Sequence, residues 1–383
     1  MELSNLAMTL GGSAIREMFN EALKMKNTIS FTVGEPDFVT PQPIIDAACE
    51  AWQKGLTHYT PNKGIQELRE AIALYHANDL KPDPDQNIMI SCGATEAIQL
   101  AMFTLVNPGD EVILVTPAWP NYFGQVGMCG AVAKVVPAYE ENGFVPDPED
   151  IRRAITDKTK LILLNSPSNP TGAVIDRSTY RRIAEILAQT KIYILADEIY
   201  SRLVYAEEPY TSICEFPELL DRVVYVSGFS KMFAMTGWRL GYAISTAPII
   251  TNMTKLHENG ASCLPAPSQL AAAAGLAKCN DDIERMREIY RRRRDMIVKE
   301  INAAEGMSCI TPLGAFYAFA NIKQTGKKSR DFCMDLLHNT GVVTVPGSGF
   351  GDAGEGYVRF TYATSEENIR EGLKRVQDYL KKA

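Results

Sequence analysis

The chain of 383 residues lacks the clustered cysteines and histidines that metal centres and disulfide frameworks need. Its eight cysteines are scattered without a C-x-x-C pair, and its four histidines lie far apart in the sequence. Structural zinc sites need closely spaced ligands, and disulfide frameworks belong mainly to short secreted chains. We therefore expect reduced thiols and no metal site.

Long apolar runs and basic stripes are also missing. A membrane-spanning helix needs about 20 apolar residues, and a signal peptide needs a basic segment before an apolar one; neither pattern is present. The net charge is −7, and the densest basic run, residues 291–294 (RRRR), lies in a charged stretch over 281–300. We interpret this run as the solvated face of a helix. These absences predict a cytoplasmic protein without a nucleic-acid or membrane partner.

Short apolar runs rich in β-branched residues alternate with helical patterns such as 95–106 and 179–189 through the middle of the chain. Continuous apolar runs are typical of strands that are buried on both faces. Alternating strands and helices favour a largely parallel sheet of the α/β class. The predicted strands cover residues 88–92, 111–116, 133–137, 160–165, 192–196, 223–227 and 240–245.

The pattern changes after residue 275. A long charged helix over 281–304 precedes short strands at 316–320, 342–345 and 358–361, with helices at 330–338 and 366–380. The first forty residues show little periodicity. Because the chain is too long for one simple core, we predict a large domain of residues 44–280 and a smaller α+β domain of residues 1–43 and 281–383.

Polar residues follow several predicted strands, at the sheet edge where α/β proteins bind ligands. Gly93, Ala94 and Thr95 lead from strand 88–92 into a helix, whose N-terminus favours a phosphate. An ordinary glycine turn with an N-cap has the same appearance. Asn169 lies in a proline-bounded loop after strand 160–165, which is either structural or holds an amide against a ligand.

Two charged residues follow the next strands. Asp197 comes directly after strand 192–196, where a carboxylate is costly to bury without a partner; it is a helix cap, an ion-pair member or the match of a cationic ligand. Lys231 follows strand 223–227, with Ser230 before it and Arg239 eight residues later. A lysine there is usually solvated, but lysine also forms Schiff bases with aldehyde cofactors, and serine and arginine bind phosphate. Together these sites supply every group that one such cofactor requires.

The stretch 227–242 (SGFSKMFAMTGWRLGY) resembles the lysine signature of the class I aminotransferases, the fold-type-I family that includes aspartate aminotransferase. Residues 165–172 (NSPSNPTG) resemble the family's asparagine loop, and 196–200 (ADEIY) its aspartate–tyrosine pair. Other family-like segments follow in family order: 34–38 (GEPDF), 59–64 (YTPNKG), 314–317 (GAFY), 346–351 (PGSGFG) and 358–364 (VRFTYAT).

The resemblance implies a fold-type-I enzyme that holds pyridoxal 5′-phosphate as a Schiff base on Lys231, which then acts as the base. It implies that Asp197 keeps the pyridine nitrogen protonated, and that Asn169 and Tyr200 bond the ring's 3-oxygen. The phosphate is expected to lie against Gly93, Ala94, Thr95, Ser230 and Arg239.

The resemblance also implies roles for four more residues. Trp119 would stack on the ring, unless it is simply a core tryptophan, and Arg359 would bind the substrate α-carboxylate close to Gly34. Tyr59 would reach the phosphate of a neighbouring subunit, which implies a homodimer with shared active sites. One departure is Gly228, which stands three residues before the lysine, where some members carry a serine phosphate ligand.

The same scaffold also supports C–S β-lyases, aminocyclopropane-carboxylate synthases, decarboxylases and ligand-sensing regulators. The loops after the strands are more similar to those of transaminases, and a regulator would carry a helix-turn-helix domain before residue 34. We expect an aminotransferase that uses L-aspartate and 2-oxoglutarate, with aromatic or alanine-type donors as alternatives. A second cation for a distal carboxylate could come from Arg16 or Lys63.

Overall fold

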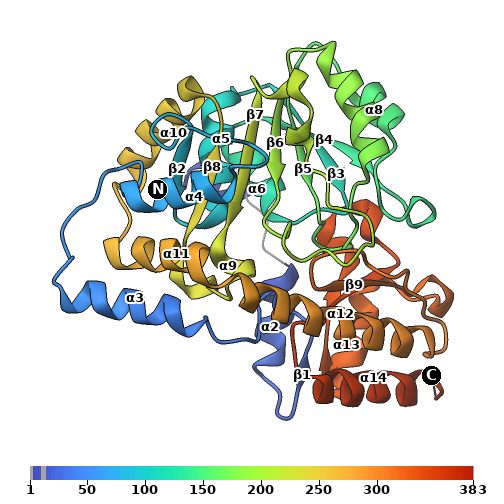
Figure 1. The fold of residues 1–383 in the computed structure, drawn as a ribbon. Coiled ribbons are helices and arrows are strands. Elements are labelled where there is room, and N and C mark those ends of the chain that lie inside the picture. The colour runs from blue at the N-terminus through green and yellow to red at the C-terminus, as the bar shows by residue number, and fades with distance from the viewer. Residues whose placement is uncertain (1–2, 10–13, 383) are drawn as a thin grey trace.

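The computed structural model describes residues 3–9 and 14–382. Residues 1–2, 10–13 and 383, which the predicted small domain includes, lie outside the described part. A seven-stranded sheet forms the centre, in the order β2-β8-β7-β6-β5-β3-β4 (Figure 1). Only β8 runs antiparallel to its neighbours, so the predicted mostly parallel sheet is confirmed. The strands are β2 (Ile88–Ser91), β3 (Glu111–Thr116), β4 (Val132–Pro137), β5 (Thr159–Asn165), β6 (Tyr193–Asp197), β7 (Val223–Gly228) and β8 (Gly241–Ile244).

Helices cover both faces of this sheet. Side chains of one strand alternate between two apolar clusters: Ile162 packs in one cluster, whereas its neighbour Leu163 packs in the other. This alternation explains why the strands are apolar throughout. One face carries α5 (Gly93–Leu105), α6 (Asn121–Met128) and α10 (Ala247–Gly260). The other carries α4 (Gln66–Tyr75), α7 (Pro148–Ala154), α8 (Arg177–Ala188) and α11 (Ala266–Lys278), with α3 (Gln42–Gln53) packed on α11.

The C-terminal part forms a second layered unit around its own apolar cluster. Its antiparallel sheet has the order β11-β12-β9. The predicted strand at 342–345 is wrong as one element, because it divides into two strands that belong to different sheets. The elements are α12 (Asn280–Asn302), β9 (Tyr317–Asn321), α13 (Ser329–Thr340), β10 (Val342–Val343), β11 (Val345–Pro346), β12 (Tyr357–Thr361) and α14 (Glu366–Leu380).

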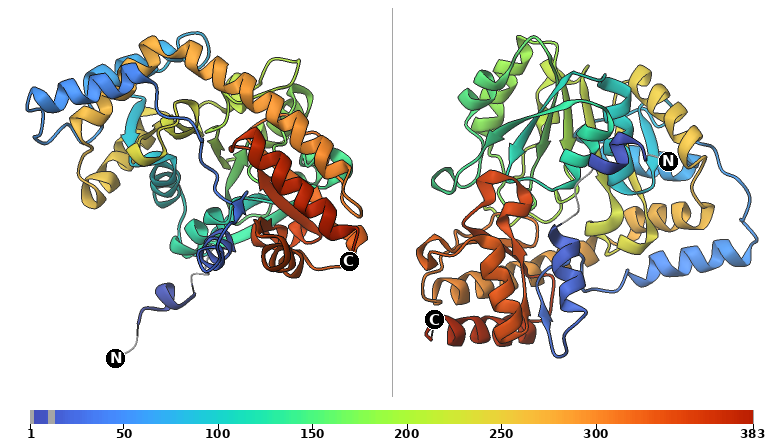
Figure 2. Two further views of the ribbon diagram at one scale, coloured as in Figure 1. Left: turned by 90° about the horizontal axis from the view of Figure 1, so that it is seen from below. Right: turned by 180° about the vertical axis from the view of Figure 1, so that it is seen from behind.

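The part of the N-terminal segment from α2 to β1 packs on this second unit (Figure 2). β1 (Ile29–Ser30) pairs in parallel with β10, and α2 (Ala14–Ala22) contacts β10 and β11. The sequence pattern did not predict α2, nor the short α1 (Asn5–Thr9). Shorter helical turns join the larger elements: α9 (Phe229–Met232), η1 (Glu140–Asn142), η2 (Ile213–Glu215), η3 (Pro217–Leu219), η4 (Thr236–Trp238), η5 (Lys323–Thr325), η6 (Gly347–Phe350) and η7 (Asp352–Gly354).

The basic run in α12 differs from its interpretation as a solvated face. Arg293 and Arg294 are buried, whereas the other two arginines of the run are exposed. The Arg293 guanidinium pairs with Asp37 at 2.7 Å and lies over the ring of Phe38. A charge pattern alone does not reveal this burial, because long arginine side chains pack their stems while their heads find distant partners.

No helix of the described residues is long and apolar enough to span a membrane. Within residues 3–9 and 14–382, no group of three or more His, Cys, Asp or Glu side chains is arranged to hold a metal ion.

Candidate active site

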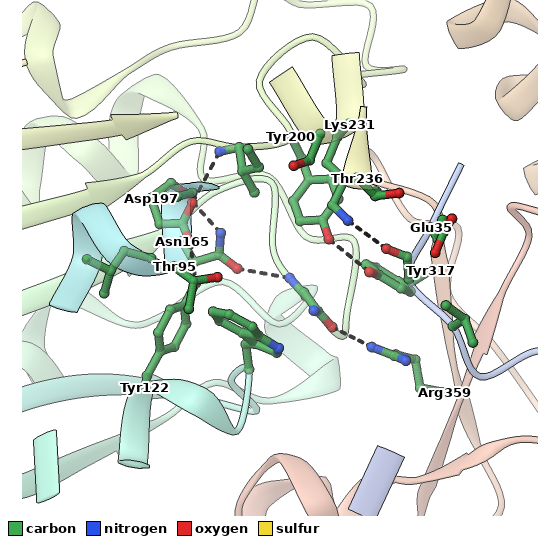
Figure 3. A pocket seen from close by; sticks show the side chains of 18 of the residues that line it. Glu35, Thr95, Tyr122, Asn165, Asp197, Tyr200, Lys231, Thr236, Tyr317 and Arg359 are labelled. Carbon is green, nitrogen blue, oxygen red and sulfur yellow. Dashed lines mark hydrogen bonds between the residues drawn. The ribbon is translucent and has the colours of Figure 1, made fainter. Parts of the chain in front are cut away.

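A cavity of about 360 Å³ lies beyond the carboxyl ends of β5, β6 and β7, a size typical of small-molecule sites. Elements from both parts of the chain line it, because β9 and β12 supply Tyr317 and Arg359 while the segment before α3 supplies Gly34 and Glu35 (Figure 3). Because β5, β6 and β7 are parallel neighbours in the sheet, the residues that follow them lie close together although they are far apart in the sequence.

Asp197 is the last residue of β6, and its carboxylate is almost completely buried. Its Oδ2 accepts a 2.5 Å hydrogen bond from the Tyr122 hydroxyl, and its Oδ1 accepts one from the Ile199 backbone at 3.2 Å (Figure 3). Burial raises the pKa of Asp197 to about 6, against the lowering effect of these hydrogen bonds and of Lys231. Tyr122, which the sequence did not single out, thus helps to keep this carboxylate ionised.

Tyr122→Phe is expected to raise the pKa of Asp197 further, because it removes a hydrogen bond that stabilises the charged form. As the pH falls, Asp197 becomes protonated and a cofactor whose protonated ring nitrogen faces it loses affinity. In Tyr122→Phe the midpoint of this loss is expected about one pH unit higher than in wild type. Titrating the cofactor-free protein with pyridoxal 5′-phosphate between about pH 5 and pH 8 measures this midpoint. Tyr139→Phe, at an exposed tyrosine, is the control; coincident midpoints for Tyr122→Phe and wild type would contradict the assignment.

Lys231 lies in α9, directly after β7, and is partly buried at the cavity wall. Its Nζ donates a 2.6 Å hydrogen bond to the Gly34 carbonyl oxygen. Burial, together with the positive charges of Arg239 and Arg359, lowers the pKa of Lys231 to about 8, against the opposing negative charges of Glu35 and Asp197. An amine with this pKa is available in its neutral, nucleophilic form near neutral pH.

The N-terminus of α5 also contributes to the cavity wall. Ala94 and Thr95 from this helix line the cavity, as do Ser230 and Arg239. Gly93 does not line it, but its φ of +74° favours glycine, and a Cβ there would lie 2.7 Å from Nη2 of Arg239 and displace that guanidinium. Backbone amides at a helix N-terminus, a hydroxyl and a guanidinium together form a site suited to a phosphate.

The close approach of β7 and β8 explains why position 228 carries a glycine rather than a serine. Gly228 faces Gly241 across the β7–β8 pair, and a Cβ on Gly228 would lie 2.9 Å from the Gly241 Cα. The two strands approach too closely here for a side chain, so a phosphate ligand from this position is excluded unless β8 moves.

Arg359 lies in β12 and is 1% exposed. Its guanidinium donates to Asn169 Oδ1 at 2.8 Å and to the Thr32 carbonyl at 2.5 Å, while its Nε has no partner. Its partners among the described residues are thus neutral, with no Asp or Glu paired to it, and burial lowers its pKa. A buried guanidinium without a counter-charge favours an anionic ligand beside it.

Asn169 and Tyr200 also line the cavity. The hydroxyl of Tyr200 lies 2.8 Å from that of Tyr317, a residue whose segment the sequence pointed to without assigning a role. Trp119 lines the cavity too and packs edge-on against Tyr122, so it is not simply a core residue. These contacts tie the large sheet to the C-terminal part across the cavity.

Three predicted residues lie elsewhere. Tyr59 is 94% exposed beside Trp52, in a surface hollow away from the cavity. Lys63 donates to the Asp85 carbonyl, and Arg16 is exposed on α2; neither lines the cavity. Among the described residues, the cations that line it are Lys231, Arg239 and Arg359.

The cavity fits pyridoxal 5′-phosphate and an amino acid. A lysine of lowered pKa suits the aldehyde, the buried Asp197 suits a protonated ring nitrogen, and the α5 N-terminus suits the phosphate. The unpaired Arg359 remains for a carboxylate. With the mostly parallel seven-stranded sheet, this fit defines the class of protein, which is a fold-type-I enzyme that depends on pyridoxal 5′-phosphate.

Comparison with known proteins agrees. Residues 26–376 match the family model described as aminotransferase class I and II. The aspartate aminotransferase of Pyrococcus abyssi is 40% identical over 100% of this chain and 99% of its own. The aromatic-amino-acid aminotransferase 2 of Thermococcus litoralis is 38% identical with the same coverage. The structure of aspartate aminotransferase from Thermus thermophilus with maleate has a TM-score of 0.94 at 35% identity, over 99% of this chain and 100% of that one. The chain belongs to the class I and II aminotransferases and is a transaminase.

Proposed function

We propose that Lys231, Asp197 and Tyr200 are the catalytic residues for moving an amino group from an L-amino acid to a 2-oxo acid. Pyridoxal 5′-phosphate, when bound, supplies an aldehyde that condenses with amines and a ring that withdraws electrons. Lys231 moves a proton between the Cα of the amino acid and the C4′ atom of the cofactor. Its lowered pKa supports this role, because a general base works best with a pKa near the working pH.

Asp197 holds the ring nitrogen protonated, and Asn169 and Tyr200 bond the 3-oxygen of the ring. The hydrogen bond from Tyr122 supports the ionised state of Asp197. Trp119 stacks on the ring, and its place in the cavity wall supports this role. The residues that bind the phosphate are Ala94, Thr95, Ser230 and Arg239, which line the cavity, and Gly93 allows the turn that presents their amides.

Arg359 binds the α-carboxylate of the substrate beside Gly34. The unpartnered Nε and the buried guanidinium support this role, because a carboxylate would supply the missing counter-charge. Asn169 orients Arg359 through its 2.8 Å hydrogen bond.

The preferred donor is an L-amino acid with an aromatic side chain. The observation that carries this choice is the composition of the cavity wall: its cations already have the roles above, Glu35 adds a negative charge, and Trp119 and Tyr317 are aromatic. An unpaired distal carboxylate would lose its hydration there, whereas an aromatic ring gains contact area. Aspartate is the second candidate, favoured by relatives that carry that name.

Steady-state kinetics with L-tyrosine, L-aspartate and L-alanine, each with 2-oxoglutarate, tests the choice. We expect kcat/KM for tyrosine to exceed that for aspartate about tenfold, a difference of about 1.4 kcal/mol. A higher value for aspartate would favour the second candidate and require a cation from outside this wall. Accumulation of ammonia with pyruvate would instead indicate a lyase.

The enzyme acts as a homodimer with shared active sites, in which Tyr59 reaches the phosphate in the partner subunit. The exposed hollow around Tyr59, Trp52 and Leu56 supports this arrangement, since large exposed apolar groups favour an interface. Sedimentation analysis tests it, and a monomer at micromolar concentration would contradict it.

The large domain covers residues 44–280, and the small domain covers 1–43 and 281–383; the β1–β10 pairing supports this division. The enzyme acts in the cytoplasm.

A further inference from the structure

The turn from β2 into α5 carries the backbone amides proposed to hold the phosphate. Side chains that do not line the cavity form hydrogen bonds to this turn, and these hydrogen bonds are called ties below. Ser91 Oγ donates to the Gly93 carbonyl oxygen at 3.0 Å. Gln125 Nε2 donates to the Thr95 carbonyl oxygen at 2.8 Å. Both ties are neutral, and both act on carbonyl groups, so they leave the amides free to face the cavity.

A third tie is ionisable. Glu96 follows Thr95 directly, and its Oε2 accepts a 2.5 Å hydrogen bond from the Cys92 backbone amide. Its Oε1 lies 3.0 Å from Nδ1 of His257, a completely buried residue of α10. Burial raises the pKa of Glu96, but the hydrogen bonds from His257 and Cys92 outweigh it and hold this pKa below its usual range. Glu96 is therefore a carboxylate that contacts both the turn and a second helix.

This carboxylate stands in the first turn of α5, where negative charge is stabilised by the helix dipole. A phosphate at the same N-terminus draws on the same field, so a free Glu96 side chain would compete with it. The contacts with Cys92 and His257 keep the Glu96 carboxylate behind the turn, and neither Glu96 nor His257 lines the cavity. The Nε2 atom of His257 is buried without a partner, so this histidine has no other hydrogen-bonding task among the described residues.

We propose that Glu96 and His257 are positioning residues for the phosphate of the cofactor. Glu96 fixes the Cys92 amide and with it the direction of the amides of Ala94 and Thr95, and His257 holds the Glu96 carboxylate away from the phosphate. The pair acts through the backbone of the turn and touches neither cofactor nor substrate. This inference rests on the proposed phosphate site.

Binding to cofactor-free protein tests the pair, with two aldehydes that differ only in the phosphate: pyridoxal 5′-phosphate and pyridoxal. The visible absorbance band that each forms with Lys231 reports its dissociation constant. We expect Glu96→Ala and His257→Leu to raise the dissociation constant of pyridoxal 5′-phosphate about tenfold and that of pyridoxal less than about twofold. His257→Asn, which keeps a donor where Nδ1 lies, is expected to bind nearly as wild type does. Glu96→Gln, of unchanged size, provides a second variant should Glu96→Ala not fold.

His76 offers a matched control. It is a second buried histidine, its Nδ1 lies 3.0 Å from the Asp79 carboxylate, and it does not line the cavity. His76→Leu is expected to lower the melting temperature but to leave both dissociation constants unchanged.

Equal weakening of both aldehydes in the Glu96 and His257 variants would overturn the proposal, because it would mean a general loss of folding. Unchanged binding of pyridoxal 5′-phosphate, or the same weakening in His76→Leu, would overturn it as well. If wild type forms no band with pyridoxal 5′-phosphate, the proposed function itself fails. A band in wild type with unaltered variants removes only the inference about this pair.

Discussion

Lys231→Ala is expected to form no visible absorbance band with pyridoxal 5′-phosphate and to transaminate at least about 10⁴-fold more slowly than wild type. Two functions are lost together, since the same amine holds the cofactor aldehyde and moves the proton from Cα to C4′. General acid–base catalysis alone contributes about 10²- to 10⁴-fold, and the loss of the covalent attachment adds to that. Alanine also leaves the Gly34 carbonyl oxygen without its 2.6 Å hydrogen bond.

Spectra of both proteins before and after addition of an amino acid, together with single-turnover kinetics, measure these effects. The amino acid should discharge the band of wild type, and a 2-oxo acid should restore it. Lys255→Ala, at an exposed lysine of α10, should retain both the band and the rate. Retention of the band in Lys231→Ala would mean that another amine carries the cofactor.

The second large effect is expected at Arg359. Arg359→Ala should lower kcat/KM by about 10²- to 10³-fold for every amino acid, because all amino acids share the α-carboxylate. That range corresponds to about 3–4 kcal/mol of lost transition-state stabilisation. Arg359→Lys should recover only part of the activity: an ammonium keeps the charge but cannot replace both N–H groups of the fork.

Kinetics with tyrosine, alanine and aspartate separate this role from a structural one. Arg294→Ala removes another buried guanidinium, one that pairs with Asp295 outside the cavity, and should reduce stability without changing kcat/KM. A loss in Arg359→Ala that is confined to aspartate would show that Arg359 binds a distal carboxylate, and the α-carboxylate assignment would then fail.

The sequence by itself determined the sheet and the edge at which the cavity lies. Each of the seven predicted strands is present, displaced by at most one residue at either end, because a strand buried on both faces needs a continuous apolar run. Parallel strands bring their carboxyl ends to one edge, so the residues that follow β5, β6 and β7 converge there. Asn169, Asp197 and Lys231 could therefore be grouped before any coordinates were known, and all three line one cavity.

Contacts between distant segments could not be predicted in this way. The bond from Tyr122 to Asp197 joins residues 75 positions apart, and the pairing of Tyr200 with Tyr317 joins residues 117 apart. No local pattern marks Tyr122, and although the sequence points to Tyr200 and to the segment of Tyr317, nothing in it shows that their hydroxyl groups meet. The sequence pattern does not predict α2, because this short amphipathic segment is stabilised by packing on β10 and β11 rather than by its own helix propensity.

The tertiary structure alone decided the surroundings of the charged side chains. Four consecutive arginines have the pattern of a solvated helix face, yet two are buried, since the turn of α12 points them inward toward Asp37 and Tyr205. Arg16 and Lys63 were candidates for the cavity, but neither lies there. A side chain's charge is written in the sequence; whether it faces water, a partner or a ligand depends on which segments the fold places around it, and that neighbourhood sets both its pKa and its role.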